Sequence, residues 1–279
     1  MNDAHDYHAW IGNTERREDD LTQSQIDSLK ALLDSSPESP LPLGLQWLVC
    51  VDRVAQSELG PDGHPKRGEF LPPVHLPRRM WAAGNIRFLS RPTGPVPVSR
   101  ESRITNIQHK QGRSGALVFV TVDHLFNLGD EPWLEEQHTI VYREASHQAF
   151  RQAPHFEAVD DTLYPYQQDV TTDAVQLFRY SAMTFNGHRI HYDQEYVTTI
   201  EGYPGLIVHG PLMATWLLNF VETIQSIEPG YELSFKVLAP VFVGETIRLL
   251  AQPVADGFLL AVCNERKEAV IEASLKRVD

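Results

Sequence analysis

The segment "HGPLMATWLLNFVETI" (209–224) restricts how this chain can fold more than any other feature. Its length and apolar spacing predict a helix, and Pro211 suits the first turn, where a missing backbone N–H leaves no hydrogen bond unmade. Apolar residues occur on almost every side of this helix, so most of its surface must be buried. A sheet wrapped around the helix would bury it in this way.

Alternating or β-branched runs on both sides of this helix predict antiparallel strands. Before the helix the runs cover residues 83–90, 98–110, 115–127 and 137–145. After the helix they cover residues 231–240, 245–254, 257–265 and 268–278. Gly, Pro or Asn residues separate the runs, as expected for turns. We also interpret "DAVQLFRYSA" (173–182) as a strand, and the whole pattern as an α+β protein.

Further segments precede the first predicted strand. Residues 21–34 have apolar side chains near helical spacing and Thr22 as a candidate N-cap, which predicts a helix. Residues 43–55 are apolar enough for a largely buried helix. Residues 57–79 are rich in Pro and Gly and predict a long ordered loop, of the kind that often carries function. Each half is therefore expected to combine one long helix with about four antiparallel strands.

The strand pattern stops between Ser146 and Gln168, and we interpret this segment as a linker. The prediction is an N-terminal domain over residues 1–150, a linker over 151–168 and a C-terminal domain over 169–279. Residue-level similarity between the halves is weak, so the expected repeat is one of architecture.

The acidic composition excludes some kinds of partner. The chain of 279 residues has 24 Lys and Arg against 37 Asp and Glu, a formal net charge of −13. Phosphate contacts need a basic surface, so nucleic acid and anionic membranes are disfavoured as partners. The first residues lack the basic and apolar regions of a secretory signal, and the longest apolar runs are too short to span a membrane. We therefore expect a soluble, cytoplasmic protein, with Cys50 and Cys263 as buried free thiols.

The loop "TFNGHRIHYD" (184–193), upstream of the apolar helix, carries the residues best suited to chemistry. His191 titrates near neutral pH and can act as a general acid or base. Asn186 both donates and accepts hydrogen bonds, so it can hold a water molecule or a substrate carbonyl. Gly210 begins the helix, where unpaired N–H groups and the helix dipole would stabilise a carbonyl oxygen that gathers negative charge.

Other interpretations of the same residues stay open. His188, His191 and Asp193 would suit a metal site, although the neighbouring Arg189 opposes a cation there. Asp193 would either cap the loop or orient His191, and Arg189 would either pair with Asp193 or meet an anionic substrate. A serine nucleophile is disfavoured because the chain has no G-x-S-x-G elbow. The segment "GPDGHPKRG" (60–68) lacks the glycine spacing of a phosphate-binding loop.

The motifs "NGHRIHYDQEY" and "VHGPL" resemble those of the MaoC-like (R)-specific enoyl-CoA hydratases and type 2 hydroxyacyl-thioester dehydratases. That family shows D-x-N-P-[IL]-H-x-D-x-x-[YF] followed by [AV]-H-G-x-L, and it has the hot-dog fold, a sheet wrapped around a helix. His191 matches the family's catalytic histidine, and Asp193 and Tyr196 match the positions that follow. His209 and Gly210 match the second motif, whose glycine N–H polarises the thioester carbonyl.

One departure from the family pattern affects the mechanism. Asn186 stands where the family has a catalytic aspartate, and His188-Arg189 replaces the N-P pair. An asparagine cannot take a proton, so a shared Asp/His acid–base scheme does not apply. The chain is more similar to a two-domain bacterial branch with a degenerate N-terminal hot-dog domain and an active C-terminal one. Members of that branch act on C5 dicarboxylyl-CoA thioesters such as mesaconyl-C4-CoA and itaconyl-CoA.

The resemblance implies a double hot-dog fold and reversible addition of water to the double bond of an enoyl-CoA thioester. His191, Asn186, Gly210 and Asp193 would form the catalytic group, with Tyr196 and His209 near the substrate. A free substrate carboxylate would need a basic partner, for which Arg78, Arg79 and Arg189 are candidates. Lys236 is a candidate for the coenzyme A phosphates. The resemblance implies no metal and no cofactor, because coenzyme A is part of the substrate.

Competing functions share parts of this pattern. A hot-dog thioesterase would use the same helix start but hydrolyse the thioester. A non-catalytic acyl-CoA-binding module would fit the loss of the acid at Asn186. A metal hydrolase would use His188, His191 and Asp193. Hot-dog sheets commonly pair, so a homodimer of double hot-dog chains is a further expectation.

Overall fold

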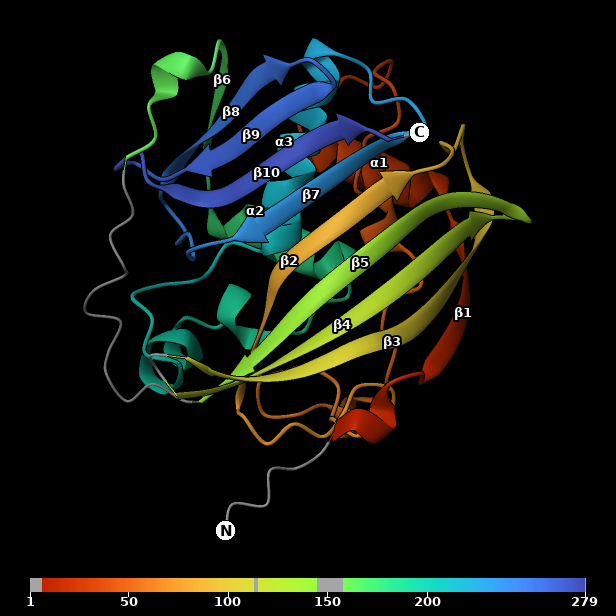
Figure 1. Ribbon diagram of the computed structural model, residues 1–279, viewed down its shortest axis with the longest axis vertical. Coiled ribbons are helices and arrows are strands. Elements are labelled where there is room, and N and C mark those ends of the chain that lie inside the picture. Colours follow the sequence, from red (N-terminus) through yellow and green to blue (C-terminus); the bar gives the residue numbers. More distant parts are fainter. Residues whose placement is uncertain (1–6, 113–114, 145–157, 279) are drawn as a thin grey trace.

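A ten-stranded antiparallel sheet curves around helix α3 (Gly210–Ile224) in the computed structural model, shown in Figure 1. The structure describes residues 7–112, 115–144 and 158–278. The strands are β1 (Thr14–Leu21), β2 (Arg78–Phe88), β3 (Val96–Gly112), β4 (Gly115–Leu128), β5 (Glu131–Arg143), β6 (Tyr166–Thr171), β7 (Tyr231–Val237), β8 (Thr246–Val254), β9 (Gly257–Cys263) and β10 (Ala269–Arg277). The strands predicted before and after the apolar helix are confirmed, and β1 and β6 were not predicted.

Strands β2 and β7 join the two halves of the chain into one sheet. The strand order is β1-β3-β4-β5-β2-β7-β10-β9-β8-β6. The β2–β7 register runs from Ala83 opposite Lys236 to Arg87 opposite Glu232. The expected pairing of two hot-dog sheets is therefore made inside a single chain.

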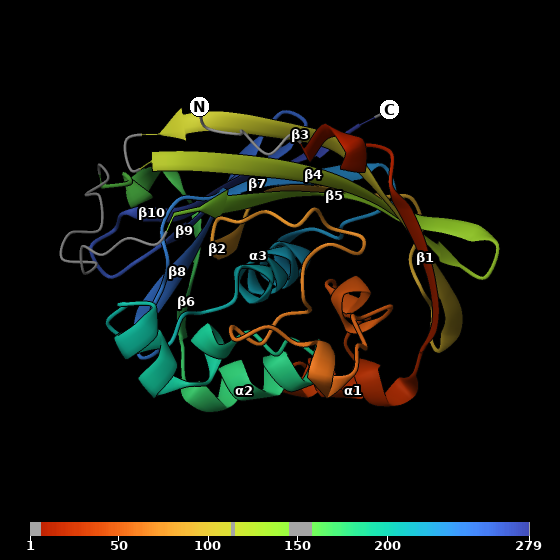
Figure 2. The ribbon, with the colours of Figure 1, turned by 90° about the horizontal axis from the view of Figure 1, so that it is seen from below.

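Helix α3 is buried as its composition requires. Figure 2 shows α3 under the concave face of the sheet, with α1 (Gln23–Leu32) and α2 (Ala174–Met183) covering its open side. Its apolar side chains, from Leu212 to Val221, belong to the main hydrophobic core. On the same helix, Asn219 accepts a hydrogen bond from the Leu43 N–H and donates one to the Leu43 carbonyl. The N-terminal half of the chain is thereby tied to the central helix of the C-terminal half.

The predicted strand at residues 173–182 is wrong, because this segment forms α2. Asp173 caps the helix by accepting from the Gln176 N–H at 3.0 Å, and the Gln176 side chain accepts from the Asp173 N–H at 3.2 Å. This reciprocal capping box stabilises a helix start. The buried residues lie at helical spacing: Leu177, Tyr180 and Ser181.

The predicted buried helix at residues 43–55 is also wrong. Its only helical turn in the structure is a 3-10 turn over Leu45–Leu48. Gly44 has φ of 99°, and a Cβ there would lie 2.8 Å from the Thr215 hydroxyl of α3. Farther along, the Cys50 N–H bonds to Asp19 of β1 rather than within a helix. The expectation of one long helix in each half therefore holds only for the C-terminal half.

The remaining predictions concern the helix at residues 21–34, the Pro- and Gly-rich segment and the linker. The helix at residues 21–34 is confirmed as α1, with Thr22 as N-cap. The Pro- and Gly-rich segment is irregular apart from a short 3-10 turn until β2 begins at Arg78. Of the predicted linker, residues 151–157 lie outside the described residues, and its last residues already begin β6.

The cysteine prediction is confirmed, since Cys50 and Cys263 are buried free thiols. Among the helices that the structure describes, none has the length and apolar character needed to cross a membrane.

Candidate active site

A cavity of about 1140 Å³ lies beside the start of α3 and takes its walls from both halves of the chain. Its lining includes His64, Arg79 and Trp81 from the N-terminal half and His188, His191 and Gly210 from the C-terminal half. The cavity thus brings the predicted loop histidines and the helix start together. It also adds residues from the N-terminal half that the motifs do not contain.

His191 is held as a neutral proton acceptor. It ends the 3-10 turn Arg189–His191, and its side chain is buried. Its Nδ1 lies 2.7 Å from the Ile207 carbonyl oxygen. A carbonyl only accepts hydrogen bonds, so Nδ1 carries the hydrogen and Nε2 keeps its lone pair. Burial lowers the pKa of His191 to about 4, so the ring is uncharged at neutral pH and ready to accept a proton.

The His209 ring packs against one face of the His191 ring. The two imidazole rings stack with centroids 3.6 Å apart and planes 19° from parallel. The Nε2 of His209 lies 2.8 Å from the Ser181 hydroxyl. Burial, and then the neighbouring His191, hold the pKa of His209 well below its usual range. His209 is fully buried and does not line the cavity, so its predicted contact with substrate is replaced by a contact with His191.

Gly210 presents the start of α3 to the cavity. The first intrahelical hydrogen bond runs from the Met213 N–H to the His209 carbonyl, so the Gly210 N–H precedes the helical ladder. A Cβ on Gly210 would lie 3.7 Å from the Trp81 ring and 3.8 Å from Val237. Glycine therefore keeps space open for a ligand at the positive end of the helix dipole. A thioester oxygen that gathers negative charge is stabilised by such a position.

Asn186 shapes the loop that carries His191. Its side-chain oxygen accepts a hydrogen bond of 3.0 Å from the His188 N–H, which closes a turn. The side chain also lines the cavity. Its carbonyl oxygen is therefore engaged in the loop. The role predicted for Asn186, holding the attacking water, would fall mainly to its NH₂ group.

Asp193, Arg189 and Tyr196 form a structural group. Asp193 Oδ2 accepts from Arg189 Nε at 2.9 Å and Nη2 at 2.8 Å, and its Oδ1 accepts from the Tyr196 N–H. The guanidinium also lies over the Tyr196 ring, 4.1 Å from its centroid. Of the open alternatives, Arg189 pairs with Asp193 and Asp193 caps the loop. The carbonyl of Ile207, not Asp193, orients His191.

The other predicted basic residues differ in their surroundings. Arg78 is tied to Glu201 by an ion pair of 3.1 Å. Arg79 lines the cavity, and within the described part of the chain its side chain has no hydrogen bond or ion pair. Lys236 is exposed and is not among the residues that line the cavity, so its contact with the coenzyme A phosphates stays a prediction. Alternation along β7 turns the neighbouring Phe235 inward and Lys236 outward.

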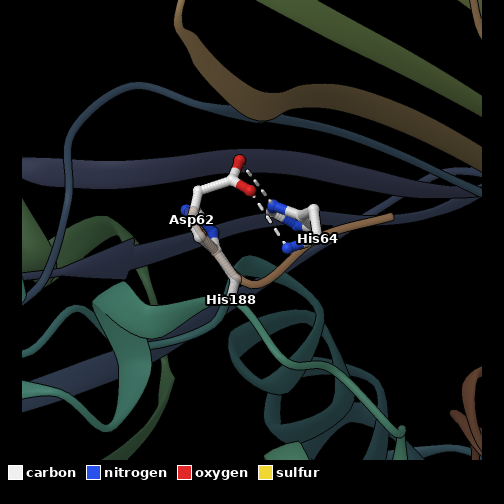
Figure 3. A group of neighbouring side chains, drawn as sticks. All are labelled: Asp62, His64 and His188. Atoms are coloured by element: carbon white, nitrogen blue, oxygen red, sulfur yellow. Dashed lines mark hydrogen bonds and ion pairs between the residues drawn. The ribbon is translucent and has the colours of Figure 1, made fainter. Parts of the chain in front are cut away.

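Sequence reasoning missed the part of the site built by Asp62 and His64, drawn in Figure 3. The Arg189 N–H donates to the Asp62 carbonyl at 2.9 Å, which docks the loop of residues 60–65 onto the histidine loop. Gly63 allows this contact, because a Cβ there would lie 1.9 Å from the Gly187 carbonyl oxygen. The available signal was the long Pro- and Gly-rich loop, which was predicted to carry function but not to reach His191.

The Asp62, His64 and His188 side chains come close enough to suggest a metal site. Their nearest ligand atoms all lie within 4.8 Å of one another. The positive charge of Arg79, however, contributes to lowering the pKa of both His64 and His188, so it also opposes a cation there. The metal set suggested by the sequence is not favoured, since Asp193 is occupied by Arg189.

A polar cluster in the N-terminal half forms another wall of the cavity. Buried Glu136 of β5 accepts from the Trp47 indole N–H at 2.8 Å and lies 2.7 Å from His138 Nε2. The His138 ring packs 4.8 Å from Trp81, measured between ring centroids. Sequence reasoning missed this cluster, although alternation along β5 places Glu136 and His138 on one face.

The curved sheet around α3 and the histidine beside the helix start define a double hot-dog protein of the acyl-thioester-processing kind. The family model for hydroxyacyl-thioester dehydratase type 2 matches residues 44–243, and the chain belongs to this family. It is 42% identical over 257 residues to the mesaconyl-C(4)-CoA hydratase of Chloroflexus aurantiacus, with 90% of each chain covered.

Solved structures show the same fold at low sequence identity. HtdX from Mycobacterium tuberculosis matches with a TM-score of 0.68 and 15% identity, covering 95% of this chain and 99% of its own. Another M. tuberculosis protein, described as having a double hot-dog fold, matches with a TM-score of 0.58 and 13% identity, with 96% of each chain covered. The expected double hot-dog fold is confirmed.

Proposed function

We propose that this protein adds water reversibly to the double bond of a short, branched C5 dicarboxylyl enoyl-CoA, of the itaconyl-CoA or mesaconyl-C4-CoA type. The observation that carries the proposal is the placement of neutral His191 beside Gly210 in one cavity. A proton acceptor and a carbonyl-polarising N–H are the two groups that this reaction needs. The similarity to a protein named mesaconyl-C(4)-CoA hydratase supports the substrate class.

In the hydration direction, the thioester oxygen accepts a hydrogen bond from the Gly210 N–H. His191 Nε2 takes one proton from water while the water oxygen bonds to the β-carbon. The π electrons of the double bond move toward the thioester and form an enolate, whose charge the helix start stabilises. Loss of one such donor typically costs about 3–4 kcal/mol of barrier. Protonated His191 then returns the proton to the α-carbon and becomes neutral again.

Arg79 is the proposed partner of the free substrate carboxylate. Arg78 is occupied by Glu201, and Arg189 is occupied by Asp193. Arg79 lines the cavity without an ion pair to any described residue. A guanidinium in this state binds a carboxylate without first breaking another contact.

The proposal includes no metal and no cofactor, because coenzyme A arrives as part of the substrate. We assign His191 and Gly210 to a catalytic C-terminal domain (169–279) and Arg79 to a degenerate N-terminal domain (1–150). The acyl-CoA thioester is the proposed partner. A homodimer is a further proposal, which light scattering on the purified protein would test.

The test is to incubate the purified protein with itaconyl-, mesaconyl-, crotonyl- and longer enoyl-CoAs and to detect hydrated product by mass. The His191→Ala variant is assayed in parallel and should lose about 10²–10⁴-fold in rate. The proposal fails if no enoyl-CoA is hydrated or if His191→Ala keeps full activity. Release of free coenzyme A without hydration would indicate a thioesterase instead, and binding without any turnover would indicate an acyl-CoA-binding module.

A further inference from the structure

The loop of residues 60–65, which carries Asp62 and His64, forms part of the cavity wall. Besides the Arg189 N–H, the Arg189 guanidinium donates to this loop, at the Pro61 carbonyl, 3.1 Å away. A Cβ on Gly187 would lie 2.6 Å from the Gly63 carbonyl oxygen, so the two loops are in backbone contact. This contact requires glycine on both sides, and it places the His64 side chain among the histidines of the C-terminal half.

Asp62 determines which nitrogen of His64 carries the hydrogen. Asp62 Oδ2 lies 3.3 Å from His64 Nδ1, and Asp62 Oδ1 accepts from the His64 N–H at 3.1 Å. Burial acts to raise the pKa of Asp62, but the hydrogen bond and charge of His64 outweigh it and lower that pKa to about 2. An ionised carboxylate only accepts, so Nδ1 of His64 donates and Nε2 keeps a lone pair.

His64 lies beside His188, which in turn packs against His191. Its ring centroid is 4.0 Å from that of His188, and the His188 ring lies 5.5 Å from His191. His64, His188 and His191 all line the same cavity. Burial, and then the charge of Arg79, lower the pKa of His64 to about 4 against the opposing effect of Asp62, so the ring is neutral at neutral pH.

A water molecule that attacks a carbon must be held by more than one group, so that its lone pair points at that carbon. His191 Nε2 accepts one of its hydrogens in the proposed reaction. The side-chain oxygen of Asn186 already accepts from the His188 N–H, so one of its two lone pairs is used within the loop. His64 Nε2 is a second neutral acceptor in the same cavity.

We propose that His64 accepts the second hydrogen of the attacking water and, together with His191, aims its oxygen at the β-carbon. His64 is then a catalytic residue, since it touches a reactant. Asp62 is a positioning residue that acts through the His64 ring. This inference rests on the proposed hydration. It adds no proton transfer to that reaction, because the hydrogen bonded to His64 stays on the oxygen of the product hydroxyl group.

The test compares four proteins in the enoyl-CoA hydration assay: wild type, His64→Ala, Asp62→Asn and the control Glu58→Gln. Glu58 lies earlier in the same segment, exposed and outside the cavity lining. His64→Ala should lower kcat about 10²-fold or more, with KM within about threefold. Added imidazole should restore part of that kcat. Asp62→Asn should lower kcat about tenfold at unchanged KM, and Glu58→Gln should behave as wild type.

The outcomes separate this inference from the proposed function. If His64→Ala hydrates the enoyl-CoA with the kcat of the wild type, or if only its KM changes, the inference is wrong. The proposed function would still stand. Absence of hydration by the wild type would overturn both. Stoichiometric metal in the wild type, with loss of activity on chelation and no rescue by imidazole, would also overturn the inference, since His64 would then bind the metal.

Discussion

The imidazole rings of His191 and His209 lie face to face, 3.6 Å apart between centroids, and only His191 reaches the cavity. His191 is therefore held by two direct contacts. Its Nδ1 donates to Ile207, one face rests on His209, and the Ser181 hydroxyl fixes His209 in turn. Such a ring starts the reaction in one tautomer and one orientation.

The Ser181→Ala variant tests this support. It removes the partner of His209 Nε2 inside the protein, and an unpaired buried polar atom costs about 1–3 kcal/mol of unfolding free energy. Urea unfolding should show that loss of unfolding free energy. The kcat should also fall, because the His209 ring that stacks on His191 is less constrained. The matched control is Ser226→Ala, at an exposed serine, which should stay within about 0.5 kcal/mol of wild type. Equal stability of the two variants would contradict the prediction.

The pH dependence of hydration tests the state of His191. The ring must be neutral to accept a proton, and its pKa is lowered to about 4. Activity should therefore stay nearly constant from about pH 8 down to pH 6 and fall only as the pH approaches 4. The measurement is kcat/KM against pH, with protein integrity checked at each point. A midpoint near 6.5, the ordinary histidine value, would show that the burial effect is absent.

Stability should also depend on pH. The pKa values of His64 and His191 are both lowered to about 4 in the folded state, so the unfolded chain binds protons first as the pH falls below about 6.5. Protonation of the unfolded chain favours unfolding. Each residue should remove about 1.4 kcal/mol of unfolding free energy per pH unit between about 6.5 and 4. Urea unfolding of wild type and His64→Gln across this range should show a shallower pH slope for the variant.

Gly210→Ala tests the helix start. The added methyl would meet Trp81 and Val237 at ordinary contact distances, so the fold should tolerate it. It would stand where the thioester oxygen approaches, and kcat should fall about tenfold to a hundredfold. Gly94→Ala is the control, because a Cβ at Gly94 meets nothing within 4 Å. If Gly210→Ala keeps the kcat of the wild type, the helix start does not stabilise the thioester oxygen in the reaction.

Arg79→Gln tests carboxylate recognition. With a dicarboxylyl enoyl-CoA the variant should raise KM about tenfold to a hundredfold, because a charge-assisted contact is lost. With crotonyl-CoA, which has no free carboxylate, its KM should match that of wild type. Lys236→Gln on the outer face of the sheet serves as control and should change neither value. An equal effect of Arg79→Gln on both substrates would assign Arg79 a different role.

The sequence predicts those parts of the fold whose pattern is local and long. Helix α3 and its flanking strands follow from apolar periodicity sustained over whole elements. The short segment that forms α2 fits either a strand or a helix, and its capping box at Asp173 and Gln176 decides for the helix. Within residues 43–55, the apolar side chains from Leu43 to Cys50 belong to the main hydrophobic core, and composition alone does not distinguish such a segment from a buried helix.

The candidate site is predicted only where its residues share one loop or one helix start. His191 and Gly210 lie in recognisable motifs, and the structure brings them to one cavity. His64 depends on the docking of a distant loop through Gly63 and Gly187, which no local pattern reveals. Asp193 was expected either to cap the loop or to orient His191, and only the structure decides, since its oxygens accept from Arg189 and the Tyr196 N–H.

The pairing of β2 with β7 joins both halves into one sheet, and the smallest unit with a complete cavity therefore includes both halves. Trp81 and Arg79 of one half line the same cavity as Val237 and Gly210 of the other, so neither half contains a complete cavity. A fragment of residues 169–279 would keep every motif residue and still lack one wall of the site. A sequence signature confined to those motifs would thus recognise a fragment with an incomplete cavity.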